Sequence, residues 1–265
     1  MLTRIFSSRS RERVKWPAGA VSGKAAVVTG GAGVIGRALA RHLVAAGVRV
    51  TLADIAADSG QALAEELGCG FIETDVRSAQ DNTRMVAAAV ESHGRLDLVF
   101  LNAGASYQSI GAALPFDPAE IDVEAYRRIL SVNIDGTVFG VSAAVGALVH
   151  SGGGSIVVTS SVAGLIGWPP DPVYTISKHG LVGYVRSIAP ALDKQGIAVN
   201  AVCPGATGHF DAGQLPPGLT ALGPDVLAAA MVEIATDGGT GRAASVVAGR
   251  ERVVQFHEFG EVEGF

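Results

Sequence analysis

The sequence predicts a single α/β domain built on a doubly wound, mostly parallel sheet of about seven strands. Short apolar segments alternate with longer amphipathic ones from residue 25 onward. The apolar segments show no polar alternation, as is typical of parallel strands covered on both faces. No repeat or composition break divides the 265 residues, of which 48% are hydrophobic. A chain of this length and composition can bury a large core.

The elements follow one another in the order of a Rossmann-like fold. Strands are expected at 25–29, 48–53, 70–76, 96–104, 154–161, 197–205 and 244–249. Helical patterns lie between them, at 34–47, 60–68, 80–94, 135–149 and 175–191. We expect the domain to span residues 23–250, between a basic N-terminal extension at 1–22 and a C-terminal tail at 251–265.

Charge is distributed unevenly along the chain. Six basic residues against one acidic residue leave positions 1–24 at +5, and because the whole chain carries −5, the rest carries −10. The basic start fits either a loosely docked extension or a targeting or electrostatic arm. The acidic remainder argues against nucleic acid as a partner.

The sequence offers no sign of a metal site or a membrane span. Cys69 and Cys203 stand in apolar segments without a CxxC or His-rich neighbourhood, so no metal is expected. Free cysteines also fit a reducing, cytoplasmic location. No apolar run approaches the roughly 20 residues that cross a bilayer.

The octet TGGAGVIG, residues 29–36, connects the first predicted strand to the first predicted helix. Glycines let a backbone approach a pyrophosphate closely, and a helix N-terminus presents free N–H groups to it. The octet therefore predicts a dinucleotide-binding turn. The expected contacts are Gly30, Gly33, Val34, Ile35 and Gly36.

Asp54 identifies the preferred dinucleotide. It ends the second strand, 18 residues after Gly36, where a carboxylate accepts hydrogen bonds from the adenosine ribose hydroxyls and repels a 2′-phosphate. No cation follows in residues 55–57, so NAD is favoured over NADP. Further cofactor contacts are expected at the ends of the next two strands, from Asp75, Val76, Asn102, Ala103 and Gly104.

The segment YTISK places Tyr174 and Lys178 four residues apart, on one face of a helix. A phenol titrates near ~10 in water, so it exchanges protons near neutral pH only if a cation stabilises the phenolate. Ser161 ends an apolar strand at the edge where ligands bind. A Tyr/Lys pair alone is also common on helix surfaces.

These segments occur together with TDV, LNAG, SVNIDG, TSSVAG and VNAVCPG, and over residues 22–250 the chain resembles the short-chain dehydrogenase/reductase family. The resemblance implies hydride transfer between nicotinamide and a secondary alcohol or ketone, with Tyr174 as general acid/base and Ser161 polarising the substrate oxygen. It implies that Asn133 is the fourth catalytic residue, which bends a helix and anchors a water near Lys178. Lys178 would also bind the nicotinamide ribose. Further cofactor contacts are implied for Pro204, Gly205 and Thr207, although His209 occupies one common threonine position.

The resemblance also implies a homodimer or homotetramer formed through the helices at 135–149 and 175–191. One feature departs from the standard-length branch, which has glycine at position 34. The spacing TGxxGxxG is that of the longer branch, which contains epimerases and dehydratases. We expect Val34 to pack into the first helix and the sheet. An NAD-dependent epimerase or dehydratase, or a catalytically idle NAD-binding scaffold, remains an alternative.

Overall fold

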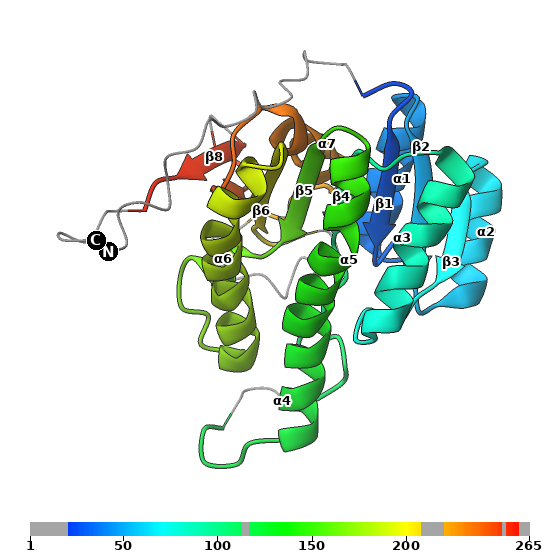
Figure 1. Ribbon diagram of the computed structural model, residues 1–265. Helices are drawn as coiled ribbons and strands as arrows, with labels where there is room; N and C mark the ends of the chain where they lie inside the picture. The colour runs from blue at the N-terminus through cyan, green and yellow to red at the C-terminus, as the bar shows by residue number, and fades with distance from the viewer. Residues whose placement is uncertain (1–20, 113–116, 208–219, 251–252, 260–265) are drawn as a thin grey trace, which may run out of the picture.

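One eight-stranded sheet forms the centre of the computed structural model, which describes residues 21–112, 117–207, 220–250 and 253–259 (Figure 1). The strand order is β3-β2-β1-β4-β5-β6-β7-β8. The strands are β1 (Ala25–Thr29), β2 (Arg49–Asp54), β3 (Gly70–Glu73), β4 (Leu98–Leu101), β5 (Gly154–Thr159), β6 (Ile197–Pro204), β7 (Ala243–Val246) and β8 (Val254–His257). All neighbouring strands are parallel except β7 and β8.

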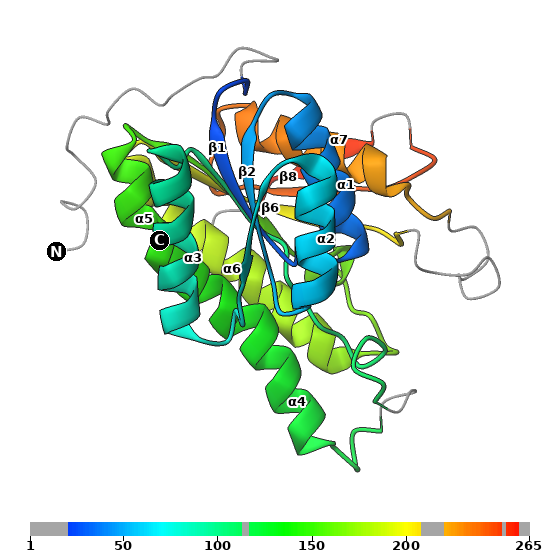
Figure 2. The same cartoon turned by 90° about the vertical axis from the view of Figure 1, so that its right-hand side faces the viewer.

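Helices cover both faces of the sheet, as Figure 2 shows. They are α1 (Val34–Ala45), α2 (Ala57–Leu67), α3 (Ala79–His93), α4 (Val123–Leu130), α5 (Gly136–His150), α6 (Pro172–Asp193) and α7 (Pro224–Thr236), with a π-helical turn η1 (Ser131–Asp135) and a 3₁₀ turn η2 (Val162–Gly164). One core cluster joins α1, α2 and α7 to the sheet, and a second joins α3, α5 and α6 to the opposite face. The predicted doubly wound fold is confirmed.

The order in which strands are added to the sheet reverses at β1, with β2 and β3 on one side of it and the later strands on the other. This strand pairs with β2 on one side and with β4 on the other, so Val27 lies opposite both Thr51 and Val99. In open α/β sheets, ligands bind at the carboxyl ends of the strands beside such a switch point. The loops that follow Thr29 and Leu101 meet there.

The sheet extends beyond residue 250 through β8, which lies in the segment expected from the sequence to be a C-terminal tail. β8 runs antiparallel to β7, and the His257 ring lies 2.8 Å from the Ser245 hydroxyl. The guanidinium of Arg242 lies 3.9 Å from the ring centroid of Phe256. An edge strand of four residues lacks the continuous apolar run of a buried parallel strand, which explains why the pattern does not reveal it.

The continuous helical segment Val123–His150 projects beyond the sheet through α4 (Figure 1). By length and composition alone it is apolar enough to cross a membrane. Its inner face accounts for part of that composition, because Val141, Ala144 and Leu148 are buried in the core between α5 and the sheet.

Candidate active site

The glycine-rich turn follows β1 and is shaped by close backbone contacts. Gly30 has a φ of +64°, and a Cβ on it would lie 2.9 Å from the Cα of Ala103. A Cβ on Gly36 would collide with the carbonyl oxygen of Gly30 and lie 2.8 Å from the Cα of Gly31. The turn therefore requires glycine at 30 and 36 to bring the start of α1 against the sheet.

The first turn of α1 fits an anionic group. Its N-cap, Gly33, has no side chain to accept a hydrogen bond, and the first turn contains no acidic residue. The N–H groups there remain available and carry the positive end of the helix dipole. These features suit the pyrophosphate of a dinucleotide.

The expected packing of Val34 is wrong. Its side chain is 48% exposed, whereas Ile35 packs against the core that contains Leu39 and Leu43. Positions 35, 39 and 43 follow one another at the spacing of a single helix face, and Val34 lies beside that face. The valine therefore lies at the mouth of the turn and not under it.

Asp54 fastens the turn to the end of β2. One carboxylate oxygen accepts the N–H of Ala32 at 2.9 Å, and the other accepts the N–H of Ala56 at 2.9 Å. The neighbouring Ile55 is 60% exposed, beside the half-buried carboxylate. Arg37, which sequence reasoning missed, donates from Nε to the carbonyl of Ala32 at 2.6 Å. An acid and a base thus hold the two peptide groups on either side of Ala32, one through its N–H and the other through its carbonyl.

The ends of β1 and β4 are tied together beneath the turn. The Thr29 hydroxyl accepts the N–H groups of Asn102 and Ala103 at 3.0 and 3.1 Å. A Cβ on Gly104 would lie 3.4 Å from both Asn133 Oδ1 and Lys178 Nζ. The segment Asn102–Gly104 therefore connects the glycine-rich turn to the catalytic candidates.

The candidates after β3 differ in their surroundings. Val76 is buried and lines one small pocket together with Thr29 and Ala103. The Asp75 carboxylate pairs with Arg77, and the hydrogen bond from Arg77 lowers the pKa of that carboxyl group. Val76 thus shares a surface with the other cofactor candidates, while the Asp75 side chain is engaged locally.

Tyr174 and Lys178 both lie on α6. Lys178 Nζ is 5.3 Å from the ring centroid of Tyr174 and donates to the carbonyl of Thr159 at 2.8 Å. Desolvation lowers the pKa of Lys178 to about 8. Desolvation also raises the pKa of Tyr174 to about 12, although hydrogen bonding with Ser161 opposes this rise. Without a ligand, Tyr174 is therefore a protonated phenol beside a lysine whose charge changes near pH 8.

The two serines after β5 have separate surroundings. Ser160 is buried, and its hydroxyl donates to the carbonyl of Lys178 at 2.9 Å. The Ser161 hydroxyl accepts the N–H of Ala163 at 3.1 Å and interacts with the Tyr174 phenol. The structure thus brings Ser161, not Ser160, to the reacting group expected on α6.

Asn133 lies in η1, the π-helical turn between α4 and α5. Its side chain is fully buried and exchanges two hydrogen bonds with the backbone of Ala105, at 2.7 and 2.9 Å. It also donates to the Ser177 hydroxyl at 2.8 Å. The widened helical turn coincides with the residue for which the resemblance implies a bend.

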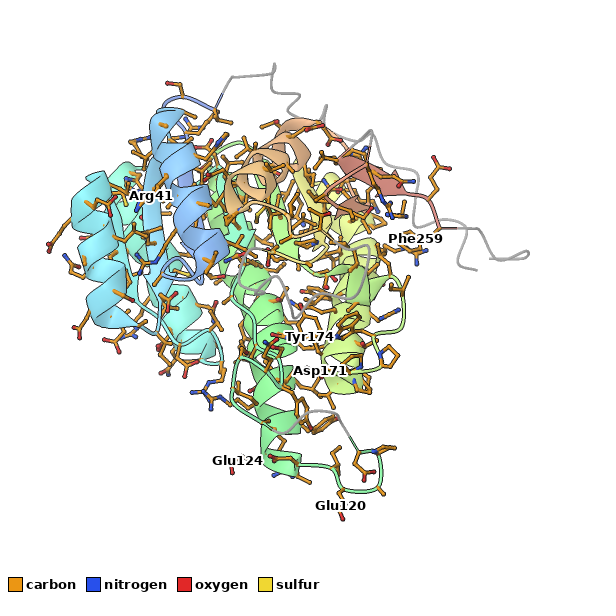
Figure 3. The ribbon with its side chains drawn as sticks, turned by 180° about the vertical axis from the view of Figure 1, so that it is seen from behind. Arg41, Glu120, Glu124, Asp171, Tyr174 and Phe259 are labelled. Atoms are coloured by element: carbon orange, nitrogen blue, oxygen red, sulfur yellow. The ribbon has the colours of Figure 1, made fainter. Side chains whose placement is uncertain are left out.

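The candidates after β6 lie at the same edge of the sheet. Gly205 donates its N–H to Val246 at 2.9 Å, directly after Pro204, which ends β6. Thr207 is buried and pairs with Leu222. His209 lies outside the described residues. The described part of the tail runs elsewhere, because Phe259 lies 4.0 Å from the Arg186 guanidinium, three turns along α6 from Tyr174 (Figure 3).

Sequence reasoning missed the residues that support this arrangement, namely Thr29, Arg37, Thr159, Asp171 and Ser177. The partners of Thr29, Thr159 and Ser177 are distant in sequence, so spacing carries no signal for these three. Arg37 contacts Ala32, only five residues away, through a backbone carbonyl. Asp171 is the exception, because an acidic residue directly before proline and a helical pattern is typical of a helix N-cap.

A family profile described as short chain dehydrogenase matches residues 24–213. Short-chain dehydrogenase reductase 4 from Arabidopsis thaliana is 38% identical over 188 residues, which cover 69% of this chain and 61% of the relative. A 2,5-dichloro-2,5-cyclohexadiene-1,4-diol dehydrogenase from Sphingobium indicum is 38% identical over 189 residues, 70% of this chain and 73% of the relative.

Tropinone reductase-like 1 from Erythroxylum coca is 37% identical over 186 residues, which cover 69% of this chain and 67% of the relative. The matched segments thus span about three fifths to three quarters of these curated relatives. Each matched segment is longer than the stretch from Thr29 to Lys178, which contains the glycine-rich turn and the catalytic candidates.

Proposed function

The chain belongs to the short-chain dehydrogenase/reductase family of oxidoreductases, and from this premise we propose that it transfers a hydride between nicotinamide and a secondary alcohol or ketone. The observation that carries the proposal is the convergence of Asn133, Ser161, Tyr174 and Lys178 at one edge of the sheet, beside the glycine-rich turn. The bound nicotinamide cofactor supplies the hydride acceptor or donor.

Tyr174 moves the proton in the proposed reaction. In carbonyl reduction, its protonated phenol donates to the developing alkoxide, and in alcohol oxidation the phenolate accepts the hydroxyl proton. Ser161 donates a hydrogen bond to the same substrate oxygen. Lys178 stabilises the phenolate with its charge, and Thr159 fixes the ammonium by accepting its hydrogen bond at 2.8 Å. Asn133 fixes the adjoining loop through Ala105.

We expect NAD to be the preferred cofactor because the Asp54 carboxylate repels a 2′-phosphate. Arg37 offers a positive charge nearby, but its Nε is engaged by the Ala32 carbonyl at 2.6 Å. The test is a panel of secondary alcohols and ketones, assayed by NADH and NADPH absorbance. Turnover of one of them with the wild-type protein supports the proposed function, and no turnover with either cofactor contradicts it.

Asp54→Asn should reduce the preference for NAD over NADP, measured as a ratio of kcat/KM values, by about tenfold or more, since it removes one charge from the ribose site. Asp58→Asn is the matched control, because Asp58 is an exposed carboxylate in the first turn of α2. An unchanged ratio in Asp54→Asn, or an equal change in both variants, contradicts the assignment of Asp54.

We further propose that a second copy of the chain covers α5 and α6. Only 39% of the most apolar window in Val123–His150 is buried within the chain, and Ile176 on α6 is 59% exposed. Gly146 and Gly183 have open space around their Cα atoms, so helices of a partner can approach closely. An apolar helix face of this kind favours a homodimer or a homotetramer built on it.

Gly183→Arg should convert the assembly to a smaller species, because the monomer has room for the side chain and the interface does not. Light scattering coupled to size-exclusion chromatography measures the change. Gln61→Arg, an exposed position on α2 at the other face of the sheet, is the control. A monomeric wild-type protein, or an unaltered Gly183→Arg assembly, contradicts this interface.

A further inference from the structure

We propose that Asp171 is a positioning residue that closes a ring of hydrogen bonds around Tyr174 and thereby couples the catalytic helix α6 to the loop after β4. The inference rests on the proposed function, because it assigns Asp171 a role in orienting the general acid/base. Figure 3 shows Asp171 and Tyr174 close together at the start of α6.

The Asp171 carboxylate connects two segments that are distant in sequence. It is only 4% exposed, and it accepts the N–H of Tyr174 at 2.8 Å and the N–H of Tyr107 at 2.9 Å, one on each oxygen. The first bond caps the 22-residue helix α6. The second holds the loop that follows Asn102–Gly104. A cap alone needs only the first bond.

The ring closes through Asn133. The Ser177 hydroxyl donates to the Tyr174 carbonyl at 2.7 Å and accepts from Asn133 at 2.8 Å. Asn133 in turn holds Ala105, two residues before Tyr107. The backbone of Tyr174 is therefore fixed at its N–H by Asp171 and at its carbonyl by Ser177. Both supports lead to the same loop.

Because the Asp171 carboxylate is buried, its charge must be stabilised by hydrogen bonds within the protein. Among the described residues, no Lys or Arg forms an ion pair with Asp171, so its charge is offset by the two N–H groups and the N-terminus of α6. The Tyr107 side chain is buried beside Val173 and Ile129. Loss of the Asp171 carboxylate therefore removes the hydrogen bonds that join the loop at Tyr107 to the start of α6 at Tyr174.

The charge of Asp171 also acts on the phenol. The charges of Asp171, at the N-cap of α6, and Cys203, on β6, act on the pKa of Tyr174, and Lys178 Nζ lies 5.3 Å from the centroid of its ring. Asp122 acts on the nearby Tyr107. The negative charge of Asp171 raises the pKa of Tyr174, though less than desolvation does. Its removal should therefore lower that pKa and move the rise of alcohol oxidation to lower pH.

Two variants separate positioning from simple helix capping. Asp171→Asn is nearly isosteric but neutral and offers one acceptor oxygen, and Asp171→Ser keeps a short cap without the reach to Tyr107. We expect kcat to fall about 10- to 100-fold in both, because small displacements of a catalytic group cost rates of that order. The pH midpoint of oxidation should fall in Asp171→Asn. Hydrogen exchange of the amides at 105–107 should accelerate in both.

Asp122→Asn is the matched control. Asp122 caps α4 by accepting the N–H of Ala125 at 2.9 Å, so this variant also loses an acidic N-cap. Asparagine keeps the capping oxygen and loses only the charge at the helix N-terminus, so this variant should lower Tm slightly without changing kcat or the pH midpoint. A double-mutant cycle of Asp171→Asn with Ser177→Ala should give a non-additive loss of kcat.

The inference is wrong if the Asp171 variants change only Tm, as Asp122→Asn does, or if the 105–107 amides exchange at the wild-type rate. A wild-type protein that turns over no alcohol or ketone instead contradicts the proposed function. In that case the exchange measurement still decides whether Asp171 couples the loop to α6.

Discussion

Tyr174→Phe should lower kcat by about a thousandfold or more while the affinity for NAD stays within about twofold of wild type. The substitution removes one hydroxyl, and with it the proton that carbonyl reduction needs and the base that alcohol oxidation needs. The ring remains to fill the same space beside Lys178. Steady-state rates and NAD titration by protein fluorescence measure the two effects separately.

Tyr184→Phe is the control, since Tyr184 is a half-buried tyrosine on the same helix, packed against the core near α6. It should retain wild-type kcat. Near-normal turnover by Tyr174→Phe would overturn the assignment of the general acid/base, and equal losses in both variants would point to damage of α6.

The pH dependence expected for this site follows from Lys178. The free protein holds the pKa of Tyr174 at about 12 and that of Lys178 at about 8, in both cases mainly through desolvation. At neutral pH the phenol is therefore protonated and Lys178 is charged, which is the state that the proposed carbonyl reduction requires. Above about pH 8 the lysine loses its charge and no longer stabilises a phenolate.

Features encoded by short spacings could be predicted from the sequence. The seven parallel strands appear as continuous apolar runs because both their faces are covered. The glycine-rich turn and the Tyr174/Lys178 pair each lie within one local element, so their spacing fixes their geometry. Ser161 lies two residues after the end of β5, so the predicted strand already places it at the ligand-binding edge of the sheet.

Features that depend on distant partners could not be predicted. Asp171 and Tyr107 are 64 residues apart, and only the fold brings them together. The Lys178 ammonium is held by a backbone carbonyl at Thr159, which leaves no trace in side-chain chemistry. β8 lies on an edge and packs through Phe256 and Arg242, so its apolar pattern is short. The predicted helix and α1 both begin at residue 34, but the exposure of Val34 depends on which face of α1 packs on the sheet, and that face contains Ile35, Leu39 and Leu43.

Gly36→Ala should reduce the affinity for NAD about a hundredfold or more, because the added Cβ meets backbone atoms that cannot rotate away. It would collide with the Gly30 carbonyl and lie 2.8 Å from Gly31 Cα, so the turn must open to admit it. Calorimetric titration with NAD measures the loss, and Tm reports whether the fold survives.

The unusual glycine spacing supplies the control for this substitution. Val34→Gly restores the standard-length spacing, and because the Val34 side chain is 48% exposed, its removal disturbs no core contact. This variant should bind NAD within about threefold of wild type, with a stability loss of about 0.5 kcal/mol or less, because valine is itself a poor helix former and position 34 is the first residue of α1. Wild-type affinity in Gly36→Ala contradicts the close approach of α1 to the turn. A large loss in Val34→Gly would show instead that the valine side chain itself supports the cofactor.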